Sequence, residues 1–123
     1  MPIVLERPRP FDPDVVTEDG RVDARRLAAA IDIPLAQLAQ ILNVKAKSLT
    51  DSPNSRKIQE PAIRLVAMMN DLAEFLQEKR FARYWLRTPQ PDLGDRTALD
   101  WLTKGKLEEI RDHVSRVVNL QPD

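Results

Sequence analysis

Residues 83–94 read RYWLRTPQPDLG, and this stretch decides how the second half of the chain folds. Tyr84 and Trp85 stand three and four residues after Phe81, so a short helix brings the three rings together on one side. The two prolines of the stretch cannot continue that helix and predict a turn directly after it.

A second short helix is predicted after this turn. Thr97 is placed to cap it, and Asp100 adds a negative charge to its first turn. Gly105 supplies a residue that ends a helix in the left-handed conformation. Trp85 and Trp101 are also side chains of the size that helical cores bury, so core packing is an alternative role for both.

From residue 22 onward, the apolar residues of the rest of the chain recur at the three- and four-residue spacing of helices. Asp23 is placed to cap the first helix, and Asn43 tolerates the left-handed turn that ends the second. The helices predicted outside the 83–105 region cover about residues 23–31, 34–42, 45–51, 59–79 and 106–119. No segment alternates between apolar and polar residues as a strand does, so the predicted fold class is all-α.

Three segments are predicted along the chain. Residues 1–20 hold four prolines and predict an irregular arm, whose candidate packing residues are Val4, Leu5 and Phe11. Residues 21–57 form a small helical bundle, and residues 58–123 form a C-terminal helical domain that the long helix joins to the bundle.

The composition excludes several classes of protein. Of the 123 residues, 42% are hydrophobic and 31% are charged, which suits a folded core and argues against wholesale disorder. Lys and Arg number 19 and so do Asp and Glu, so contact with nucleic acid requires a local basic patch. The absence of cysteine excludes disulfides and thiolate ligands. No apolar run approaches the about 20 residues of a spanning helix and the first residues are no signal peptide, so we expect a soluble cytoplasmic protein.

Residues 35–49 have the spacing of a helix-turn-helix motif. Ala39 is the small residue at which the two helices approach, and Val44 and Leu49 are the inward anchors of the second helix. The polar side chains that face outward or follow directly are the candidate DNA contacts: Lys45, Lys47, Ser48, Thr50, Arg56 and Lys57.

Residues 45–57 carry four positive charges against the single negative charge of Asp51. Such a patch suits phosphates and base edges in a major groove, which predicts operator DNA as a partner. Small helical bundles with a tight turn also occur in proteins that never bind DNA, so a scaffold role for this bundle stays open.

The helix predicted over residues 59–79 is apolar on an unusually broad arc. Its apolar stripe is wider than packing against one neighbour requires, because it also includes Ile63, Met68 and Phe75. A helix of this kind packs against other elements on two sides, and the arc also motivates the hypothesis of a homodimer within a larger assembly.

The stretch 83–94, together with LDWL at residues 99–102 and Gly105, resembles the C-terminal toxin-binding domain of the Xre/MbcA/ParS family of antitoxins. The usual pattern of that domain is close to W-L-x-x-P-x-P-x-L-G, a Leu-Asp-x-Leu helix and a glycine. The resemblance covers about residues 60–120, and Asp95 stands where the family often has a second glycine. It implies a bacterial protein that neutralises a partner enzyme and binds the promoter of its own operon.

In this family the partner commonly has a RES domain that consumes NAD, and the antitoxin covers its active site. The resemblance therefore implies a RES-type toxin as the partner of this chain. The expected contacts lie on the exposed parts of the last two helices and on the tail: Lys104, Arg111, His113, Arg116, Val118, Asn119 and Leu120. Arg116 is the preferred residue, because an arginine suits a site built to hold pyrophosphate. A pair between Arg116 and Asp112 on a solvated face is an equal alternative.

Catalysis has little basis in this sequence. His113 is the only histidine, and without cysteine the common triads and metal sites lack parts. The spacing of Asp92, Asp95 and Asp100 matches no calcium loop. We therefore expect an antitoxin that is not an enzyme and needs no metal or cofactor. The alternatives are a stand-alone helix-turn-helix transcriptional regulator and an interaction protein that never binds DNA.

Overall fold

The computed structural model describes residues 14–119, and its regular secondary structure is helical. Within this range no strand forms, although two isolated bridges join Val16 to Val22 and Gln90 to Arg96. The all-α prediction is confirmed. The helices are α1 (Ala24–Ile31), α2 (Leu35–Leu42), α3 (Ala46–Asp51), α4 (Gln59–Leu76), α5 (Lys79–Leu86), α6 (Ala98–Thr103) and α7 (Leu107–Val118), with short 3₁₀ turns η1 (Arg56–Ile58) and η2 (Pro91–Leu93).

Local signals in the sequence set the ends of several helices. The Asp23 carboxylate accepts hydrogen bonds from the backbone N–H groups of Arg25 and Arg26 at 2.9 and 3.1 Å, which caps α1. Asn43 ends α2 with a φ of 61°, and the Thr97 hydroxyl accepts from the Asp100 N–H at 3.0 Å to cap α6. The three predicted caps are confirmed because each depends on its own short segment.

The residues before α1 are more ordered than the predicted arm. Val15 is fully buried, and the Asp23 N–H donates to its carbonyl at 2.8 Å. The side chain of Gln59 holds the backbone of Val22 from the start of α4, with Oε1 accepting at 2.8 Å and Nε2 donating at 3.0 Å. Val4, Leu5 and Phe11, the predicted packing residues of the arm, lie outside the described residues.

Helix α4 is shorter than the sequence predicted. It ends at Leu76 instead of continuing to Lys79, because Gln77 adopts a left-handed conformation with a φ of 72° and the chain turns into α5. The broad apolar arc is also only partly buried. Met68 faces the core, whereas Ile63 and Phe75 are 53% and 48% exposed.

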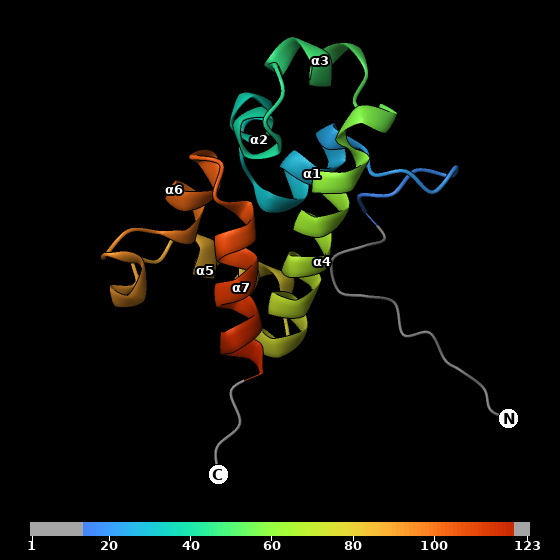
Figure 1. The fold of residues 1–123 in the computed structure, drawn as a ribbon. Coiled ribbons are helices and arrows are strands. Elements are labelled where there is room, and N and C mark those ends of the chain that lie inside the picture. Colours follow the sequence, from blue (N-terminus) through green and yellow to red (C-terminus); the bar gives the residue numbers. More distant parts are fainter. Residues whose placement is uncertain (1–13, 120–123) are drawn as a thin grey trace, which may run out of the picture.

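One apolar interior runs through the described part of the chain. Helices α4 and α7 lie side by side and point the same way, with α3 at the far end of the molecule (Figure 1). Helix α2 contacts α6, so the first helices pack directly on the last ones. The large side chains with no exposed surface come from both predicted segments: Leu27, Ile31, Leu38, Leu49, Ile58, Leu65, Met69, Leu72, Leu86, Leu102 and Ile110. The interior is continuous across residue 57, and the division there into two domains stays a prediction.

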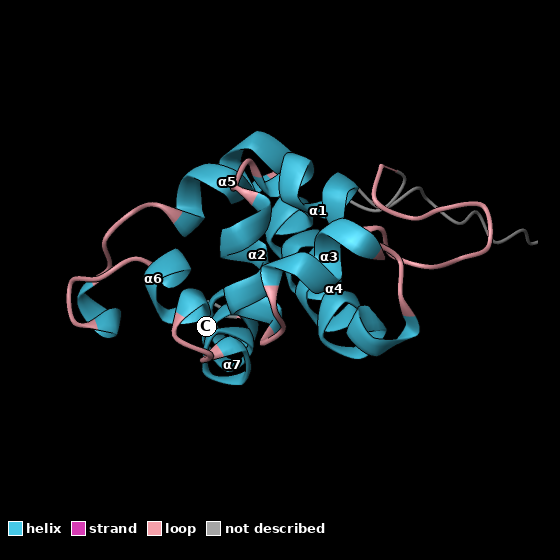
Figure 2. Ribbon diagram, turned by 90° about the horizontal axis from the view of Figure 1, so that it is seen from above, coloured by secondary structure: helices cyan, strands magenta, loops and turns pink. Residues whose placement is uncertain are grey.

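Helix α5 holds the end of α1 through two arginines, and the two helices lie next to each other in the view from above (Figure 2). The Arg87 guanidinium donates to the carbonyls of Ile31 at 3.0 Å and Asp32 at 2.6 Å. Arg83 donates to the carbonyl of Ala30 at 3.2 Å. The last carbonyls of a helix lack partners within it and carry partial negative charge, so cationic donors stabilise them.

No helix within residues 14–119 combines the length and the apolar character that crossing a bilayer requires.

We expect Arg87→Ala to lower the free energy of unfolding by about 2–3 kcal/mol, because charged donors to two helix-end carbonyls are lost. Urea denaturation followed by circular dichroism measures this change. Arg56→Ala is the matched control, since Arg56 is exposed in η1 and its removal should change stability by no more than about 0.5 kcal/mol. Equal effects of the two variants would contradict the role of Arg87.

Candidate functional site

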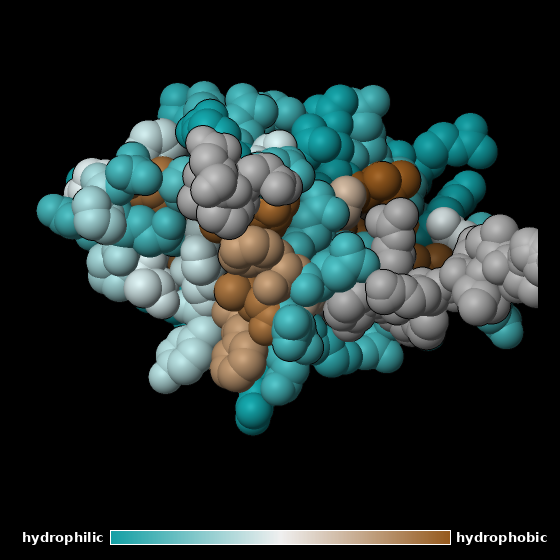
Figure 3. Space-filling view, turned by 90° about the horizontal axis from the view of Figure 1, so that it is seen from below, coloured by the Kyte–Doolittle hydropathy of each residue, from teal (hydrophilic) through white to brown (hydrophobic). Residues whose placement is uncertain are grey.

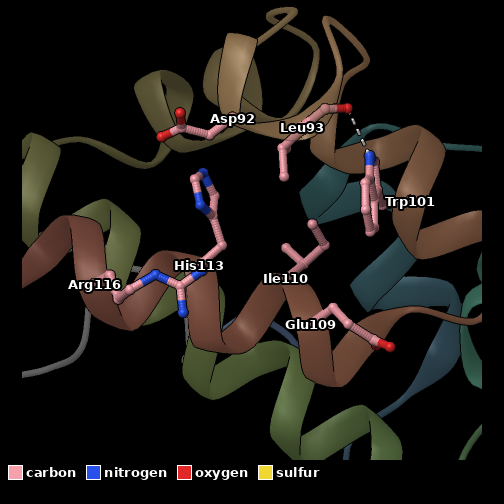
Figure 4. A pocket seen from close by; sticks show the side chains of 7 residues that line it. All are labelled: Asp92, Leu93, Trp101, Glu109, Ile110, His113 and Arg116. Atoms are coloured by element: carbon pink, nitrogen blue, oxygen red, sulfur yellow. Dashed lines mark hydrogen bonds between the residues drawn. The ribbon is translucent and has the colours of Figure 1, made fainter.

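A cavity of about 410 Å³ lies between η2, α6 and α7 in the C-terminal half (Figure 4). Leu93, Trp101 and Ile110 contribute apolar side chains to its lining, and Asp92, Glu109 and Arg116 contribute charged ones. The full set of lining residues is Asp92, Leu93, Trp101, Glu109, Ile110, His113 and Arg116.

The double-proline turn builds one wall of this cavity. The carbonyl of Gln90 accepts from the N–H groups of Leu93 and Asp95 at 3.0 and 2.9 Å, and this closes the turn on itself. Asp95 has a φ of 62°, a conformation that glycine adopts more easily. The Trp101 indole N–H donates to the Leu93 carbonyl at 3.1 Å, so α6 fixes the turn (Figure 4).

His113 is buried, which corrects the prediction that it lies on the exposed face of the last helix. The residue is only 6% exposed, and its ring stacks on that of Trp85 with 5.8 Å between the ring centroids. The ring Nε2 donates to Gln90 Oε1 at 3.0 Å, which ties α7 to the double-proline turn. The other amide atom, Gln90 Nε2, is buried with no hydrogen-bond partner among residues 14–119. The contact of His113 with a toxin stays a prediction, and its observed contacts are structural.

Arg116 stands exposed beside the cavity and makes no hydrogen bond or ion pair with any described residue, Asp112 included. Of the two interpretations left open by the sequence, the solvated pair with Asp112 does not form. Asp92 and Glu109, which line the same cavity, likewise have no ion-pair partner within residues 14–119. The cavity therefore presents charges of both signs, without ion-pair partners among the described residues, next to apolar side chains.

The other predicted toxin contacts do not gather at this cavity. Lys104 is exposed at the end of α6, and Arg111 forms an ion pair with Glu108 at 2.8 Å. Arg111 lines a separate cavity with residues of α4, whereas Arg116 lines the cavity at η2 and α6. The set is thus divided between two sides of α7.

The last predicted contacts lie at the end of α7. Val118 is half-buried against the core, and the Asn119 amide donates to the Ser115 carbonyl at 2.8 Å. Leu120 lies outside the described residues.

Seen from below, apolar atoms gather in the middle of the face at which α4 and α7 end (Figure 3). Phe75 is 48% exposed near the end of α4.

A second candidate surface surrounds α3. Three residues connect it to α2, and the two predicted inward anchors are Leu49, which is fully buried, and Val44, which is half-buried against the core. Lys45, Arg56 and Lys57 are exposed. Lys47 is also exposed, but its ammonium forms an ion pair with Asp51 at 2.8 Å.

The two hydroxyl residues of this surface differ in availability. Ser48 is half-buried, and the Thr50 hydroxyl donates to the Ala46 carbonyl at 3.2 Å, one turn back in α3. Arg25 joins the surface from α1, because its guanidinium donates to the Thr50 carbonyl at 2.9 Å. Sequence reasoning missed Arg25, since only the packing of α1 against α3 brings it there.

Asp92 and Glu109 were also missed as members of a common site. The reason is that no local pattern in the sequence places η2 over α7. Within residues 14–119, no group of three or more His, Asp or Glu side chains is arranged to hold a metal ion.

Comparison with known proteins finds a family match in the C-terminal half. Residues 65–117 match the family described as the antitoxin Xre/MbcA/ParS C-terminal toxin-binding domain. A chain in the crystal structure of the M. tuberculosis MbcT–MbcA toxin–antitoxin complex is similar in fold, with a TM-score of 0.53 and 15% sequence identity. The alignment covers 77% of this chain and 89% of that one. No curated protein matches the sequence.

We expect His113→Ala to lower the free energy of unfolding by about 2–4 kcal/mol, because it removes a buried ring and leaves Gln90 Oε1 without its donor. Arg116→Ala, three residues further along α7 and exposed, should change it by no more than about 0.5 kcal/mol. Chemical denaturation of both variants gives the comparison. A His113→Ala variant as stable as the wild type would place the ring at the surface.

Proposed function

We propose, from the match of residues 65–117 to the Xre/MbcA/ParS C-terminal toxin-binding domain, that the C-terminal helices of this chain bind a toxin protein and cover its active site. The observation that carries this proposal is Arg116, which pairs with no residue in the described range 14–119 and lines a cavity together with apolar side chains. The chain acts in this proposal by occlusion and performs no chemistry of its own.

The surface around Arg116 has the composition of a protein-binding site. Apolar atoms gather on the face at which α4 and α7 end (Figure 3), and Arg116 belongs to the last turn of α7. Arginine and aromatic side chains with apolar surroundings are enriched where protein interfaces bind most strongly. Arg116 is not held by a carboxylate of the described chain, so binding a partner does not require an existing ion pair to break.

We further propose a RES-type toxin that consumes NAD as the partner. A site that holds NAD must bind its pyrophosphate, and such a site presents cationic groups and N–H donors. A guanidinium inserted there therefore needs acidic residues nearby as its partners. An inserted Arg116 is suited to pair with acidic residues of that site. The unpaired Asp92 and Glu109 are suited to basic side chains around its entrance.

We expect the product of the neighbouring gene to co-purify with this chain and to consume NAD only when the chain is absent. Arg116→Ala should weaken inhibition by about tenfold or more, as the loss of a central interface arginine does. Arg26→Ala, exposed on α1, is the control and should inhibit as the wild type does. An NAD-consumption assay with purified partner and increasing amounts of each variant measures this.

A point substitution is preferable to removing α7. Leu107, Ile110 and Val114 of this helix are buried in the shared interior, so a chain ending at Gly105 would lose its fold together with its interface. Full inhibition by Arg116→Ala would show that Arg116 is not at the interface. A neighbouring product that consumes no NAD would remove the RES assignment but would leave toxin binding in place.

We also propose that the surface around α3 binds operator DNA. Lys45, Arg56 and Lys57 are exposed there, and Arg25 adds a fourth positive charge. Phosphate contacts of this kind position a protein on DNA, and the short α3 would carry the base contacts. The ion pair of Lys47 with Asp51 reduces its contribution, so Lys45 should matter more.

We expect Lys45→Ala to weaken binding to upstream DNA and to lower the slope of log K against log salt by up to about one unit, because one phosphate contact is lost. Lys47→Ala should have a smaller effect. Lys104→Ala, the same residue type at the end of α6, is the control. A mobility-shift series at several salt concentrations provides the slopes. Absence of binding at low salt would favour an interaction protein that never binds DNA.

The remaining predictions from the sequence concern self-association, gene regulation and location in the cell. A homodimer would use the exposed part of the α4 arc, Ile63 and Phe75, and sedimentation of the purified chain tests it. A stand-alone transcriptional regulator would bind the operator but capture no partner. The proposed assembly would act in the cytoplasm, where operator DNA is found.

A further inference from the structure

The outer face of α5 carries exposed aromatic side chains that the proposed site does not use. Tyr84 is 72% exposed and Phe81 is 41% exposed. Trp85, the third ring of the predicted trio, turns inward and stacks on His113 instead. The fold thus divides the trio, and two large rings remain at the surface without a role in the core.

These rings border a cavity of about 360 Å³ that is rich in arginine. Arg80, Arg83 and Arg87 line it together with the two rings, and Asp32 is its single carboxylate. We call this surface, made of Asp32, Arg80, Phe81, Arg83, Tyr84 and Arg87, the α5 surface.

Two of its guanidinium groups are fixed in place without being neutralised. Arg87 donates to the carbonyls of Ile31 and Asp32, and Arg83 donates to the carbonyl of Ala30 through Nη1 alone. Arg83 Nε and Nη2 bond to no described residue. This edge of a guanidinium is the one that binds a carboxylate through two parallel hydrogen bonds.

The third arginine is already satisfied. Arg80 forms an ion pair with Glu78 at 2.8 Å and lies 5.1 Å from the centre of the Phe81 ring. The charge open to a partner therefore comes from Arg83 and Arg87, opposed only by Asp32. Because main-chain carbonyls orient both groups beforehand, a bound carboxylate would cost little side-chain ordering.

We propose that the α5 surface is a second contact with the toxin and binds an acidic side chain flanked by an apolar residue. The Arg83 edge receives the carboxylate, and Tyr84 and Phe81 cover the apolar neighbour. Exposed tyrosine and arginine clustered around a hollow are the composition of strong protein contacts. This inference rests on the proposed function, since it names further chemistry of the same partner.

The charge around the α5 surface favours a protein over a nucleic acid. Binding to phosphates gains its strength from many basic groups that release counterions together. Here Asp32 and Glu78 interrupt the basic groups, so an extended phosphate chain would meet negative charge at several points. A single carboxylate requires only the Arg83 edge.

We expect Asp32→Asn to tighten binding to the co-purified toxin by about threefold, because it removes a carboxylate that repels the incoming one. Asparagine tolerates the left-handed conformation of residue 32, which has a φ of 68°, so the fold should be unchanged. Arg83→Gln and Tyr84→Ala should each weaken binding about tenfold or more. Calorimetric titration of the full chain at two salt concentrations measures each dissociation constant.

Glu18→Ala is the control, since Glu18 is exposed before α1 and is not among the residues that line this cavity. Unchanged binding by Arg83→Gln and Tyr84→Ala, with binding still weakened by Arg116→Ala, would overturn this inference and leave the proposed function standing. Weaker binding by Asp32→Asn would show a basic occupant and also overturn it. If the Tyr84→Ala variant lost self-association or single-stranded DNA binding but still bound the toxin, the α5 surface would belong to that other function and this inference would be wrong. Capture of no toxin by the wild type would remove both proposals.

Discussion

The hydrogen bonds from Arg87 to the last carbonyls of α1 are the contact on which the arrangement of the two halves depends. They fix α5 against the first helix, at 3.0 Å to Ile31 and 2.6 Å to Asp32. With α5 fixed, Trp85 reaches His113 of α7 on the inner side, while Tyr84 faces solvent on the outer side. A cation at the C-terminal end of a helix is favourable wherever it occurs. Here it also joins elements more than fifty residues apart in sequence.

The resemblance that the sequence shows can now be expressed as contacts. Trp85, the first residue of the pattern, stacks on His113. Trp101 of α6 donates its indole N–H to the carbonyl of Leu93 in the double-proline turn. The family often has glycine where this chain has Asp95, and the φ of 62° at that residue explains the preference. The pattern is thus largely a description of how one turn is held between two helices, and the proposed toxin-binding surface lies beside it.

Sequence reasoning succeeded where one short segment determines the result. The caps at Asp23 and Thr97 and the left-handed Asn43 each follow from side chains within a few residues. It was wrong about the end of α4, because Gln77 carries no signal for a left-handed turn and only the packing of α5 on α4 favours it. It placed His113 outside for a similar reason: a polar residue on an amphipathic helix is expected at the surface until its partner, Gln90 of a distant turn, is known.

The continuous interior has a consequence for how long each molecule survives. Side chains from α1, α2, α4, α6 and α7 share it, so opening one part removes packing from the others. A protease that cuts chains when they open would then end the proposed DNA binding and the proposed toxin binding in the same event. If both proposals hold, turnover of the chain would release the DNA and the toxin together, and the lifetime of the fold would set the timing of both.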